Sequence, residues 1–288
     1  NVIINQADGG VFQKPSADSN SGQPQSLYTN PFIKGPMIRE SKDFFGRKSE
    51  IKTIFTLLQS MSSCSVVGNR RIGKSSLLYY ITLMCREKLG EDYRIVYVDL
   101  QAAQCHTLTG LIAAIGEKLF SPAILRQINS SSNILVDFEK NIRDLRKTGV
   151  RPVVCLDEFE NLIKRTGFTD DFFDSWRSLG KDGCLAFITA SQSKLYNLFV
   201  DGKLTSSFYN ILGLLELGVF SHSESWEFVN TYKFTQEERE AIIQMAKGHP
   251  LKLQIAAWHI TQAKVEGEFD LQTALAKARV EMDSMIRG

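Results

Sequence analysis

An eight-residue stretch between an apolar run and a helical pattern limits the possible folds of this chain more than any other feature. Residues 68–75 read Gly-Asn-Arg-Arg-Ile-Gly-Lys-Ser and match G-x-x-x-x-G-K-[ST] at every position. The apolar residues 64–67 precede it, and residues 74–89 have the composition of a helix. A strand that turns through glycines into a helix directs backbone N–H groups and the positive end of the helix dipole at one point. The stretch therefore predicts a phosphate-binding loop, or P-loop, in an α/β fold.

Each residue of the loop has a chemical reason to be there. Gly68 and Gly73 let the backbone turn tightly and approach phosphate oxygens. Lys74 supplies a positive charge for the β- and γ-phosphates, and the Ser75 hydroxyl is a hard oxygen ligand for Mg²⁺. The pattern therefore predicts a nucleoside triphosphate bound with Mg²⁺. The nucleotide-binding residues predicted from the loop are Gly68, Asn69, Arg70, Arg71, Ile72, Gly73, Lys74, Ser75 and Ser76.

A second apolar run ends in two acidic residues and predicts the other half of the site. Residues 152–156 have the composition of a buried strand, and Asp157 and Glu158 follow it. Ligands of open α/β sheets bind outside the carboxyl ends of the strands, which places both acids near the P-loop. Asp157 is expected to hold Mg²⁺ through its water shell, and Glu158 to polarise the attacking water. Glu160 is interpreted as a surface residue of the following helix.

Strand and helix patterns alternate along most of the chain, which predicts βαβ units. We expect a P-loop NTPase fold with three αβα layers around a five-stranded, mainly parallel sheet. The strands are expected at 64–67, 94–100, 152–156, 185–190 and 211–217, and the helices at 50–59, 74–89, 107–120, 134–148 and 169–179. The strand 185–190 has room to insert between the P-loop strand and the strand that ends at Asp157. The residues that follow it, Ser191 and Gln192, are predicted to sense the γ-phosphate, with simple strand-end capping as the alternative.

The chain is expected to contain two folded parts after a linker. Residues 1–30 are rich in Ser, Asn, Gln, Gly and Pro and are interpreted as a linker or extended arm, in which residues 1–5 could form a short strand. Residues 31–218 are expected to form the P-loop domain, and residues 219–288, which lack strand patterns, a small helical domain. The expected helices of the second part begin at the capping boxes Ser221/Glu224 and Thr235/Glu238, and at about 251 and 270.

Composition and charge disfavour several classes of protein. The hydrophobic fraction of 43% and charged fraction of 23% are ordinary for a globular protein, and the net charge of +2 gives no support to binding of bulk nucleic acid. No apolar run approaches the roughly 18 residues that span a membrane, and the N-terminus lacks a signal-peptide pattern. The five cysteines form no C-x-x-C pair, which favours a reduced, cytoplasmic setting and disfavours a metal site built from cysteines. Because the chain begins with Asn rather than Met, we expect a fragment of a longer protein.

Four short segments, in this order and spacing, resemble P-loop ATPases of the AAA+/STAND branch. They are Phe45-Gly46-Arg47-x-x-Glu50, GNRRIGKSS at 68–76, VVCLDE at 153–158 and Gly248-His249-Pro250. Over about residues 30–265 the chain resembles in particular the prokaryotic STAND-type ATPase modules, which are related to origin-recognition-like ATPases. The chain also lacks the N-K-x-D stretch of ordinary guanine recognition, so ATP and ADP are expected rather than GTP.

The resemblance implies roles for two further parts of the chain. Residues 32–47 would wrap the adenine, with the Phe45-Gly46-Arg47 segment close to the nucleotide; alternatively, Arg47 only caps the helix that follows it. The helical domain would act as a lid that opens and closes with the nucleotide state. His249 and Pro250 would then face the phosphates, with an ordinary turn between helices as the alternative.

The chain departs from STAND proteins after the fourth strand, where many of them carry Arg. Here residues 189–192 read Thr-Ala-Ser-Gln, and a γ-phosphate sensor without positive charge predicts slow turnover. No arginine finger is identified, because surface placement explains Arg165 and Arg177 equally well. For Arg70 and Arg71 we expect either a contact with phosphate or with a partner subunit, or the alternative that both are solvated residues of the loop.

Three functions remain open after these observations. The first is a regulatory ATPase switch with slow hydrolysis, which would associate with itself in the ATP state and control effector or sensor domains outside this sequence. The second is an initiator-like, DNA-associated ATPase, and the third a nucleotide-binding module without meaningful hydrolysis. A small-molecule kinase is disfavoured, because a kinase needs an acceptor pocket rather than the water-activating Glu158. No membrane partner is expected.

Overall fold

A computed structural model describes residues 30–267 and 269–286 of the chain. Residues 31–288 form one compact unit, to which all the elements described below belong. The predicted linker or arm at 1–30, with its optional strand at 1–5, lies outside the described residues except for its last residue.

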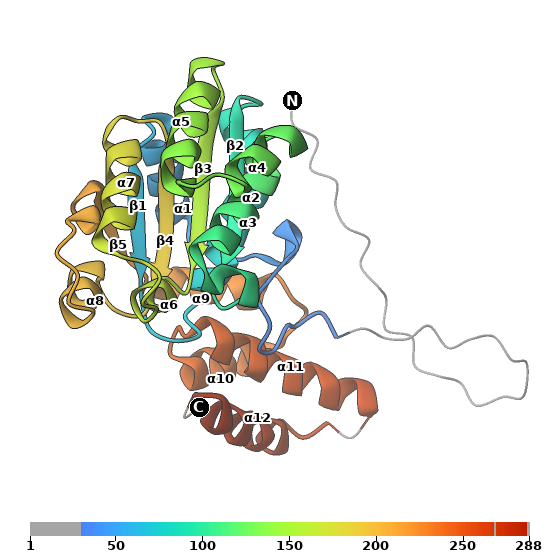
Figure 1. Ribbon diagram of the computed structural model, residues 1–288. Helices are drawn as coiled ribbons and strands as arrows, with labels where there is room; N and C mark the ends of the chain where they lie inside the picture. The colour runs from blue at the N-terminus through green and yellow to red at the C-terminus, as the bar shows by residue number, and fades with distance from the viewer. Residues whose placement is uncertain (1–29, 268, 287–288) are drawn as a thin grey trace, which may run out of the picture. The chain divides into compact units, whose positions relative to one another are not determined.

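Five parallel strands form the sheet in the order β2-β3-β4-β1-β5 (Figure 1). They are β1 (Ser63–Val67), β2 (Tyr93–Asp99), β3 (Arg151–Asp157), β4 (Ala186–Ser191) and β5 (Leu212–Glu216). This sheet confirms the predicted P-loop NTPase fold, and β4 lies between β1 and β3 as expected, with Val66 opposite Ala190. All five residues of β1 and all six of β4 are buried, as in parallel sheets that helices cover on both faces.

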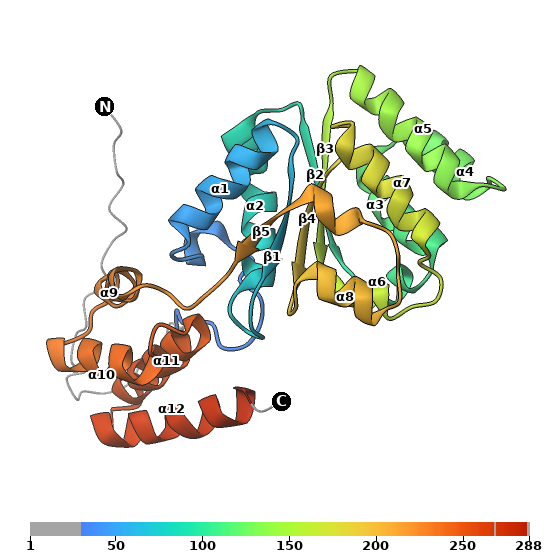
Figure 2. The same cartoon turned by 90° about the vertical axis from the view of Figure 1, so that its left-hand side faces the viewer.

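Two layers of helices cover the sheet, one on each face. They are α1 (Lys48–Gln59) and α2 (Lys74–Leu89) on one face, and α3 (Leu108–Leu119), α5 (Ile134–Lys147) and α7 (Asp170–Lys181) on the other (Figure 2). Alternation along β3 divides the core between these layers, because successive side chains of a strand point to opposite faces. Val153 and Cys155 pack with the residues of α1 and α2, whereas Val154 and Leu156 pack with those of α3, α5 and α7.

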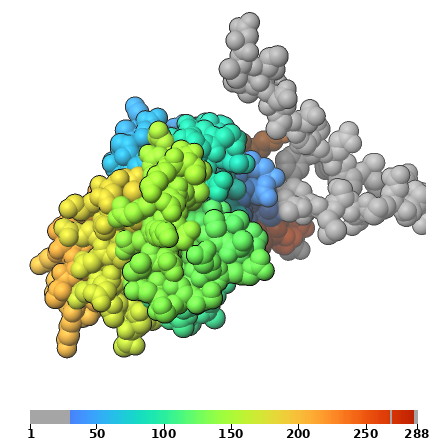
Figure 3. Space-filling view, turned by 45° about the horizontal axis from the view of Figure 1, so that its top comes forward, coloured from blue at the N-terminus to red at the C-terminus, as the bar shows by residue number. Residues whose placement is uncertain are grey.

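Several short elements are not predicted by the sequence patterns. They are α4 (Pro122–Asn129), α6 (Glu160–Ile163), α8 (Leu195–Asp201) and the 3₁₀ turns Ser41–Asp43, Ala103–His106 and Phe208–Ile211. Helices as short as α4 and α8 are marginal in isolation and depend on tertiary packing. Ile128 of α4 and Phe199 of α8 are fully buried in the larger core. Figure 3 shows the face on which the segments from α3 to α7 gather.

Four helices follow β5 and have a hydrophobic core of their own; we call them the C-terminal bundle. They are α9 (His222–Asn230), α10 (Gln236–Ala246), α11 (Pro250–Glu266) and α12 (Leu271–Ile286). Both expected capping boxes are present, at the starts of α9 and α10. Phe32 joins this core, with its ring centroid 4.4 Å from that of Tyr232, so the segment before α1 is anchored on the bundle. In the described part of the chain, no helix combines the length and the hydropathy that a membrane span requires.

Candidate nucleotide-binding site

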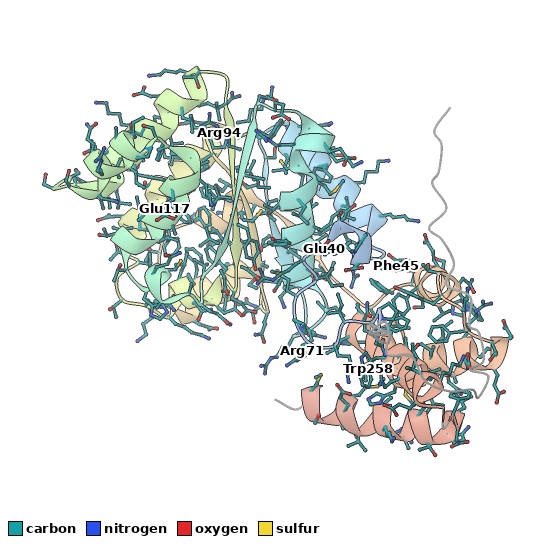
Figure 4. All side chains as sticks on the ribbon, turned by 90° about the vertical axis from the view of Figure 1, so that its right-hand side faces the viewer. Glu40, Phe45, Arg71, Arg94, Glu117 and Trp258 are labelled. Carbon is teal, nitrogen blue, oxygen red and sulfur yellow. The ribbon has the colours of Figure 1, made fainter. Side chains whose placement is uncertain are left out.

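A cavity of about 240 Å³ lies beside the P-loop, where three separate parts of the chain meet. One wall is the P-loop with the start of α2, and a second is the segment 33–47. The third wall comes from α9, from Phe220 before it and from the first turn of α11, and Glu158 lines the same cavity. In Figure 4, Phe45 and Arg71 both lie in this region between the sheet and the bundle. The fold thus brings together segments that the sequence separates by some two hundred residues.

The two glycines of the P-loop are required for different reasons. At Gly68, a Cβ atom would lie 2.6 Å from the backbone oxygen of Leu217, so the position has no room for a side chain. At Gly73, a Cβ atom would meet nothing within 4 Å, but φ is +100°, a conformation that other residues rarely adopt. Gly73 is also the N-cap residue of α2, so this turn aims the helix N-terminus into the loop.

Lys74 begins α2 and is held inside the loop. Its side chain is buried, and Nζ donates to the backbone oxygens of Gly68 at 2.8 Å and Asn69 at 3.1 Å. Burial lowers the pKa of Lys74, while the negative charges of Glu158, Glu160 and Asp157 oppose that change. A phosphate group in the loop would replace carbonyl partners by charged oxygens, which bind an ammonium group more strongly.

Gly68→Ala should lower the affinity for ATP more than about tenfold, because the new methyl group collides with the Leu217 carbonyl and displaces the loop amides. Equilibrium titration with a fluorescent ATP analogue measures this change. Gly167→Ala is the matched control, since a Cβ atom at Gly167 would meet nothing within 4 Å and the residue lies outside the loop. Equal affinities of the two variants for the ATP analogue would show that the backbone shifts to make room for the methyl group without displacing the loop amides.

Asp157 and Glu158 follow one another at the carboxyl end of β3. Asp157 is buried; its Oδ2 accepts a hydrogen bond from the Tyr97 hydroxyl at 2.7 Å, and its Oδ1 accepts one from the Glu158 N–H at 3.1 Å. Glu158 has a φ of +55° and lines the cavity. Burial raises the pKa of Glu158, and the charges of Glu160 and Asp157 raise it further, against the opposing effect of Lys74. A carboxylate with a raised pKa is a stronger base for an attacking water.

Ser75 and Asp157 are the two residues predicted to hold Mg²⁺. Ser75 lines the cavity. Asp157 does not line it, and both of its carboxylate oxygens accept hydrogen bonds from protein groups. Mg²⁺ takes most of its ligands from phosphates and water, with one or two from the protein. One hydroxyl at the cavity and one buried carboxylate at the end of β3, two strands from β1, fit that mode if Asp157 acts through water.

Glu160 is buried next to the site, so the interpretation as a surface residue is wrong. It is the first residue of α6 and is buried, and its Oε2 has no hydrogen-bond partner among the described residues. Its charge raises the pKa of both Lys74 and Glu158. The fully buried Phe159 and Leu162 hold this single turn against the core, which turns position 160 inward.

Ser191 and Gln192 lie at the end of β4, outside the residues that line the cavity. The Ser191 hydroxyl is buried and donates to the backbone oxygen of Ser193 at 2.7 Å, and Gln192 is exposed. The Gly68 N–H donates to the Ser191 backbone oxygen at 3.3 Å. The strand end is therefore fixed against the P-loop, and contact of either side chain with a γ-phosphate stays a prediction.

Arg47 lines the cavity, but its guanidinium is occupied by the protein itself. The residue is 3% exposed and precedes α1 with a φ of 64°, without a side-chain cap hydrogen bond. Its Nη2 donates to the backbone oxygens of Ile72 at 3.1 Å and Gly218 at 2.6 Å, and its Nη1 contacts Glu50 at 3.2 Å. Its backbone N–H donates to Glu224 of α9 at 2.8 Å. Arg47 therefore joins the P-loop, α1 and the start of the bundle, and burial lowers the pKa of its guanidinium.

The first turn of α11 contributes to the cavity in a way that only partly matches the sequence analysis. Pro250 lines it together with Leu251 and Gln254, and Gln254 Oε1 accepts a hydrogen bond from the Ile33 N–H at 3.1 Å. His249 does not line this cavity and lines a second one instead. The sequence patterns did not identify Leu251 and Gln254 as site residues. Gln254 lies three positions after Leu251 and four after Pro250, so the three residues share one face of the helix, and this spacing could have revealed them.

Solved structures of low sequence identity share this fold. The Walker-type ATPase of Pyrococcus abyssi matches with a TM-score of 0.65 and 20% identity, over 90% of this chain and 77% of that chain. The ORC2 protein of Aeropyrum pernix, in ADPNP–ADP complexes, matches with a TM-score of 0.64 and 15% identity, over 86% and 69%. The ORC1 protein of Aeropyrum pernix in complex with DNA matches with a TM-score of 0.56 and 15% identity, over 83% and 66%.

The sequence itself matches a family over most of its length. A comparison with curated proteins gives no match. The family described as an ATPase domain predominantly from Archaea matches residues 44–255. The matched span contains the P-loop, β3 with its two acids, and the first turn of α11. This chain belongs to that family of ATPase domains, found predominantly in Archaea.

Proposed function

We propose that this chain is a regulatory, ATP-driven switch in which the C-terminal bundle is the lid, as in the STAND-type modules that the sequence resembles. The observation that carries the proposal is the make-up of the cavity, whose walls come from the P-loop and from α9 and α11. A nucleotide in this cavity contacts both parts at once. Loss of one phosphate then changes the contacts that hold the bundle, and a ligand shifts a conformation only through such differential contacts.

The apolar side chains of the cavity support adenine as the base. Phe44, Phe45 and Leu251 line it, and the Ile38 N–H donates to the Ser76 hydroxyl at 3.1 Å, which fixes the segment 33–47 against α2. Flat apolar walls with a few fixed polar groups are the usual setting of a small-molecule site. ATP and ADP should therefore raise the melting temperature more than GTP does at equal concentration, and equal stabilisation by GTP would contradict the adenine assignment.

The residues near the P-loop divide the phosphate chemistry among them. Ser75 and Asp157 would hold Mg²⁺, which neutralises phosphate charge when bound. Lys74 would bind the β- and γ-phosphates, and Glu158 would polarise the attacking water. Residues 189–192, at the end of β4, carry no positive charge, which is why we expect slow turnover.

Amide hydrogen exchange on the whole chain tests the switch. We expect the non-hydrolysable ATP analogue ADPNP to slow exchange more than ADP does in the link 217–221 and in the first turn of α11. The helix α4, which does not line the cavity, serves as the internal control and should not respond. Identical exchange with both nucleotides at saturation would overturn the switch and leave nucleotide binding intact.

We also propose that the ATP state supports self-association and controls effector or sensor domains outside this sequence. The molar mass measured by light scattering should rise with ADPNP relative to ADP at the same protein concentration. An unchanged mass in both states would contradict the self-association.

An initiator-like, DNA-associated ATPase is the second candidate. The ORC1 protein of Aeropyrum pernix, which shares the fold, has been solved in complex with DNA. The net charge of +2 is the reason to rank this candidate behind the switch. Strong stimulation of ATP turnover by duplex DNA, without a difference in exchange between ADP and ADPNP, would favour it. Absence of phosphate release with intact ATP affinity would instead indicate a nucleotide-binding module.

A further inference from the structure

Tyr97 stands in the middle of β2 and reaches the acidic end of β3. The two strands run parallel and side by side, with Tyr97 opposite Cys155 and Asp99 opposite Asp157 (Figure 1). Tyr97 and Cys155 both pack with the residues of α1 and α2. Residues two apart on a strand share a face, so Asp157 presents its side chain on the same face as Tyr97. Tyr97 therefore lies next to Asp157, although no residue of β2 lines the nucleotide cavity.

The hydroxyl of Tyr97 holds the carboxylate of Asp157 directly. It donates to Asp157 Oδ2 at 2.7 Å, the short distance that a charged acceptor favours. Burial raises the pKa of Tyr97, so the phenol keeps its proton and is the donor. Met37 Sδ lies 3.5 Å from the same hydroxyl, but a thioether is a weak acceptor, so the proton goes to the carboxylate. Because Met37 lines the nucleotide cavity, this hydroxyl contacts both a wall of that cavity and the carboxylate.

The two hydrogen bonds to Asp157 orient its carboxylate without neutralising it. Oδ2 accepts from Tyr97 and Oδ1 from the Glu158 N–H, whereas an ionised carboxylate can accept about four hydrogen bonds. In the part of the chain that the structure describes, no ion pair includes Asp157. Both oxygens can therefore accept further hydrogen bonds from the waters that Mg²⁺ keeps.

The ring of Tyr97 contacts the helix that carries Ser75, the other residue expected to hold Mg²⁺. It meets the ring of Tyr79 edge-on, with the centroids 5.5 Å apart and the planes at 82°. Tyr79 lies four residues after Ser75 in α2, so the two residues share one face of that helix. One side chain thus contacts both elements that carry the expected Mg²⁺ ligands, α2 through its ring and the end of β3 through its hydroxyl.

We propose that Tyr97 is a positioning residue for the Mg²⁺ site, whose hydroxyl holds the Asp157 carboxylate in the orientation that receives the water shell of the ion. The proposal rests on the proposed function, which assigns Ser75 and Asp157 to Mg²⁺. Without the hydroxyl, the Glu158 N–H is the one donor left to this carboxylate among the described residues, and the carboxylate can rotate about its Cβ–Cγ bond. Binding of Mg²⁺ must then restrict that rotation, which lowers the affinity for the ion.

Calorimetric titration of MgCl₂ into the whole chain, loaded with an equal amount of ADPNP, tests the proposal. Tyr97→Phe removes only the hydroxyl oxygen, and it should raise the Kd for Mg²⁺ about tenfold, as loss of a group that orients a metal ligand typically does. The affinity of the variant for a fluorescent ADPNP analogue in EDTA should stay within about threefold of wild type, because Tyr97 does not line the cavity.

Tyr93→Phe is the matched control, because Tyr93 lies on the same strand and makes the same kind of contact away from the site. Its hydroxyl donates to the Leu58 backbone oxygen at 3.0 Å and accepts from Arg151 at 2.9 Å, and it does not line the nucleotide cavity. Both variants lose one internal hydrogen bond to a phenol and should lower Tm, but only Tyr97→Phe should lower the affinity for Mg²⁺. Equal affinities of wild type, Tyr97→Phe and Tyr93→Phe for Mg²⁺ would overturn the positioning role.

A double variant shows whether Tyr97 acts through the carboxylate. In Asp157→Ala, Mg²⁺ still has the phosphates and Ser75 as ligands, so its affinity remains measurable. Adding Tyr97→Phe to Asp157→Ala should change that affinity less than about twofold, because the hydroxyl then has no carboxylate to hold. A further loss of about tenfold in this background would overturn the role through Asp157. Loss of Mg²⁺ affinity in Tyr97→Phe, together with identical hydrogen exchange in ADP and ADPNP, would support the positioning role and overturn the proposed switch.

Discussion

Glu158→Gln should lower ATP turnover about 100-fold or more while it leaves the affinity for ATP within about threefold, because a positioned general base contributes about 10²–10⁴ in rate. Glutamine keeps the size of the side chain but cannot take a proton from water. Nucleotide affinity is expected to depend mainly on the P-loop, which the change does not touch. Phosphate release and fluorescent-nucleotide titration on the same sample measure the two quantities. Glu117→Gln, an exposed change on α3, is the control (Figure 4).

The same variant should also be more stable than wild type at neutral pH. Burial and the nearby Glu160 and Asp157 raise the pKa of Glu158. A carboxyl group whose folded-state pKa is raised stabilises the fold below its ordinary pKa, and that stability is lost as the pH rises through the raised value. At pH 7 the ionised group therefore opposes folding, and Glu158→Gln should raise Tm by about 1–3 °C.

The pH dependence gives this prediction a second check. The difference in Tm should shrink as the pH falls below about 4, where the carboxyl group is largely protonated in both the folded and the unfolded state. If Glu158→Gln hydrolysed ATP at the wild-type rate, Glu158 would not be the general base. Loss of ATP affinity together with turnover would show that Glu158 binds nucleotide rather than activating water.

Arg47→Met should lower the free energy of unfolding by about 3–5 kcal/mol, because breaking a buried ion pair leaves its partners without compensation. Methionine keeps much of the aliphatic length but removes every donor. The backbone oxygens of Ile72 and Gly218 and the carboxylate of Glu50 then lose their partner. Urea unfolding followed by circular dichroism measures the loss.

An exposed arginine of α2 provides the matched comparison for Arg47. Arg86 pairs with Glu91 at 2.9 Å, and both side chains are largely exposed. Exposed pairs of this kind contribute about 0–1 kcal/mol, so Arg86→Met should cost less than about 1 kcal/mol. Similar losses in the two variants would mean that the Arg47 contacts add no stability of their own. We also expect Arg47→Met to remove the difference in hydrogen exchange between ADP and ADPNP at the link 217–221.

Much of the fold can be predicted because its signals are local. The helix α2 has the bounds that the sequence predicts, because Gly73 and Gly90 stand at its two ends. The starts of α9 and α10 follow from pairs three residues apart, Ser221 with Glu224 and Thr235 with Glu238. The position of β4 between β1 and β3 also agrees with the prediction that strand 185–190 inserts between the P-loop strand and the strand that ends at Asp157.

The site could be predicted only where its residues lie close together in the chain. The P-loop and the pair Asp157 and Glu158 are continuous patterns that need no partner to be seen. Leu251 and Gln254 belong to no such continuous pattern, because they become part of the site only when α11 packs against the segment 33–47. The sequence predicts Glu160 as a surface residue of the following helix, whereas the burial of Phe159 and Leu162 turns it inward.

The sequence by itself determined the phosphate loop at 68–75 and the acidic end of β3, because each depends on neighbours within one turn or one strand. It also determined the αβα architecture, because strand and helix patterns alternate along the chain. The tertiary structure alone decided that Arg47 bonds to Gly218, a residue 171 positions away, and that His249 lines the second cavity instead of the first. A buried charge takes whatever acceptors the packing brings within reach, and residues so far apart carry no shared local pattern that would reveal their contact.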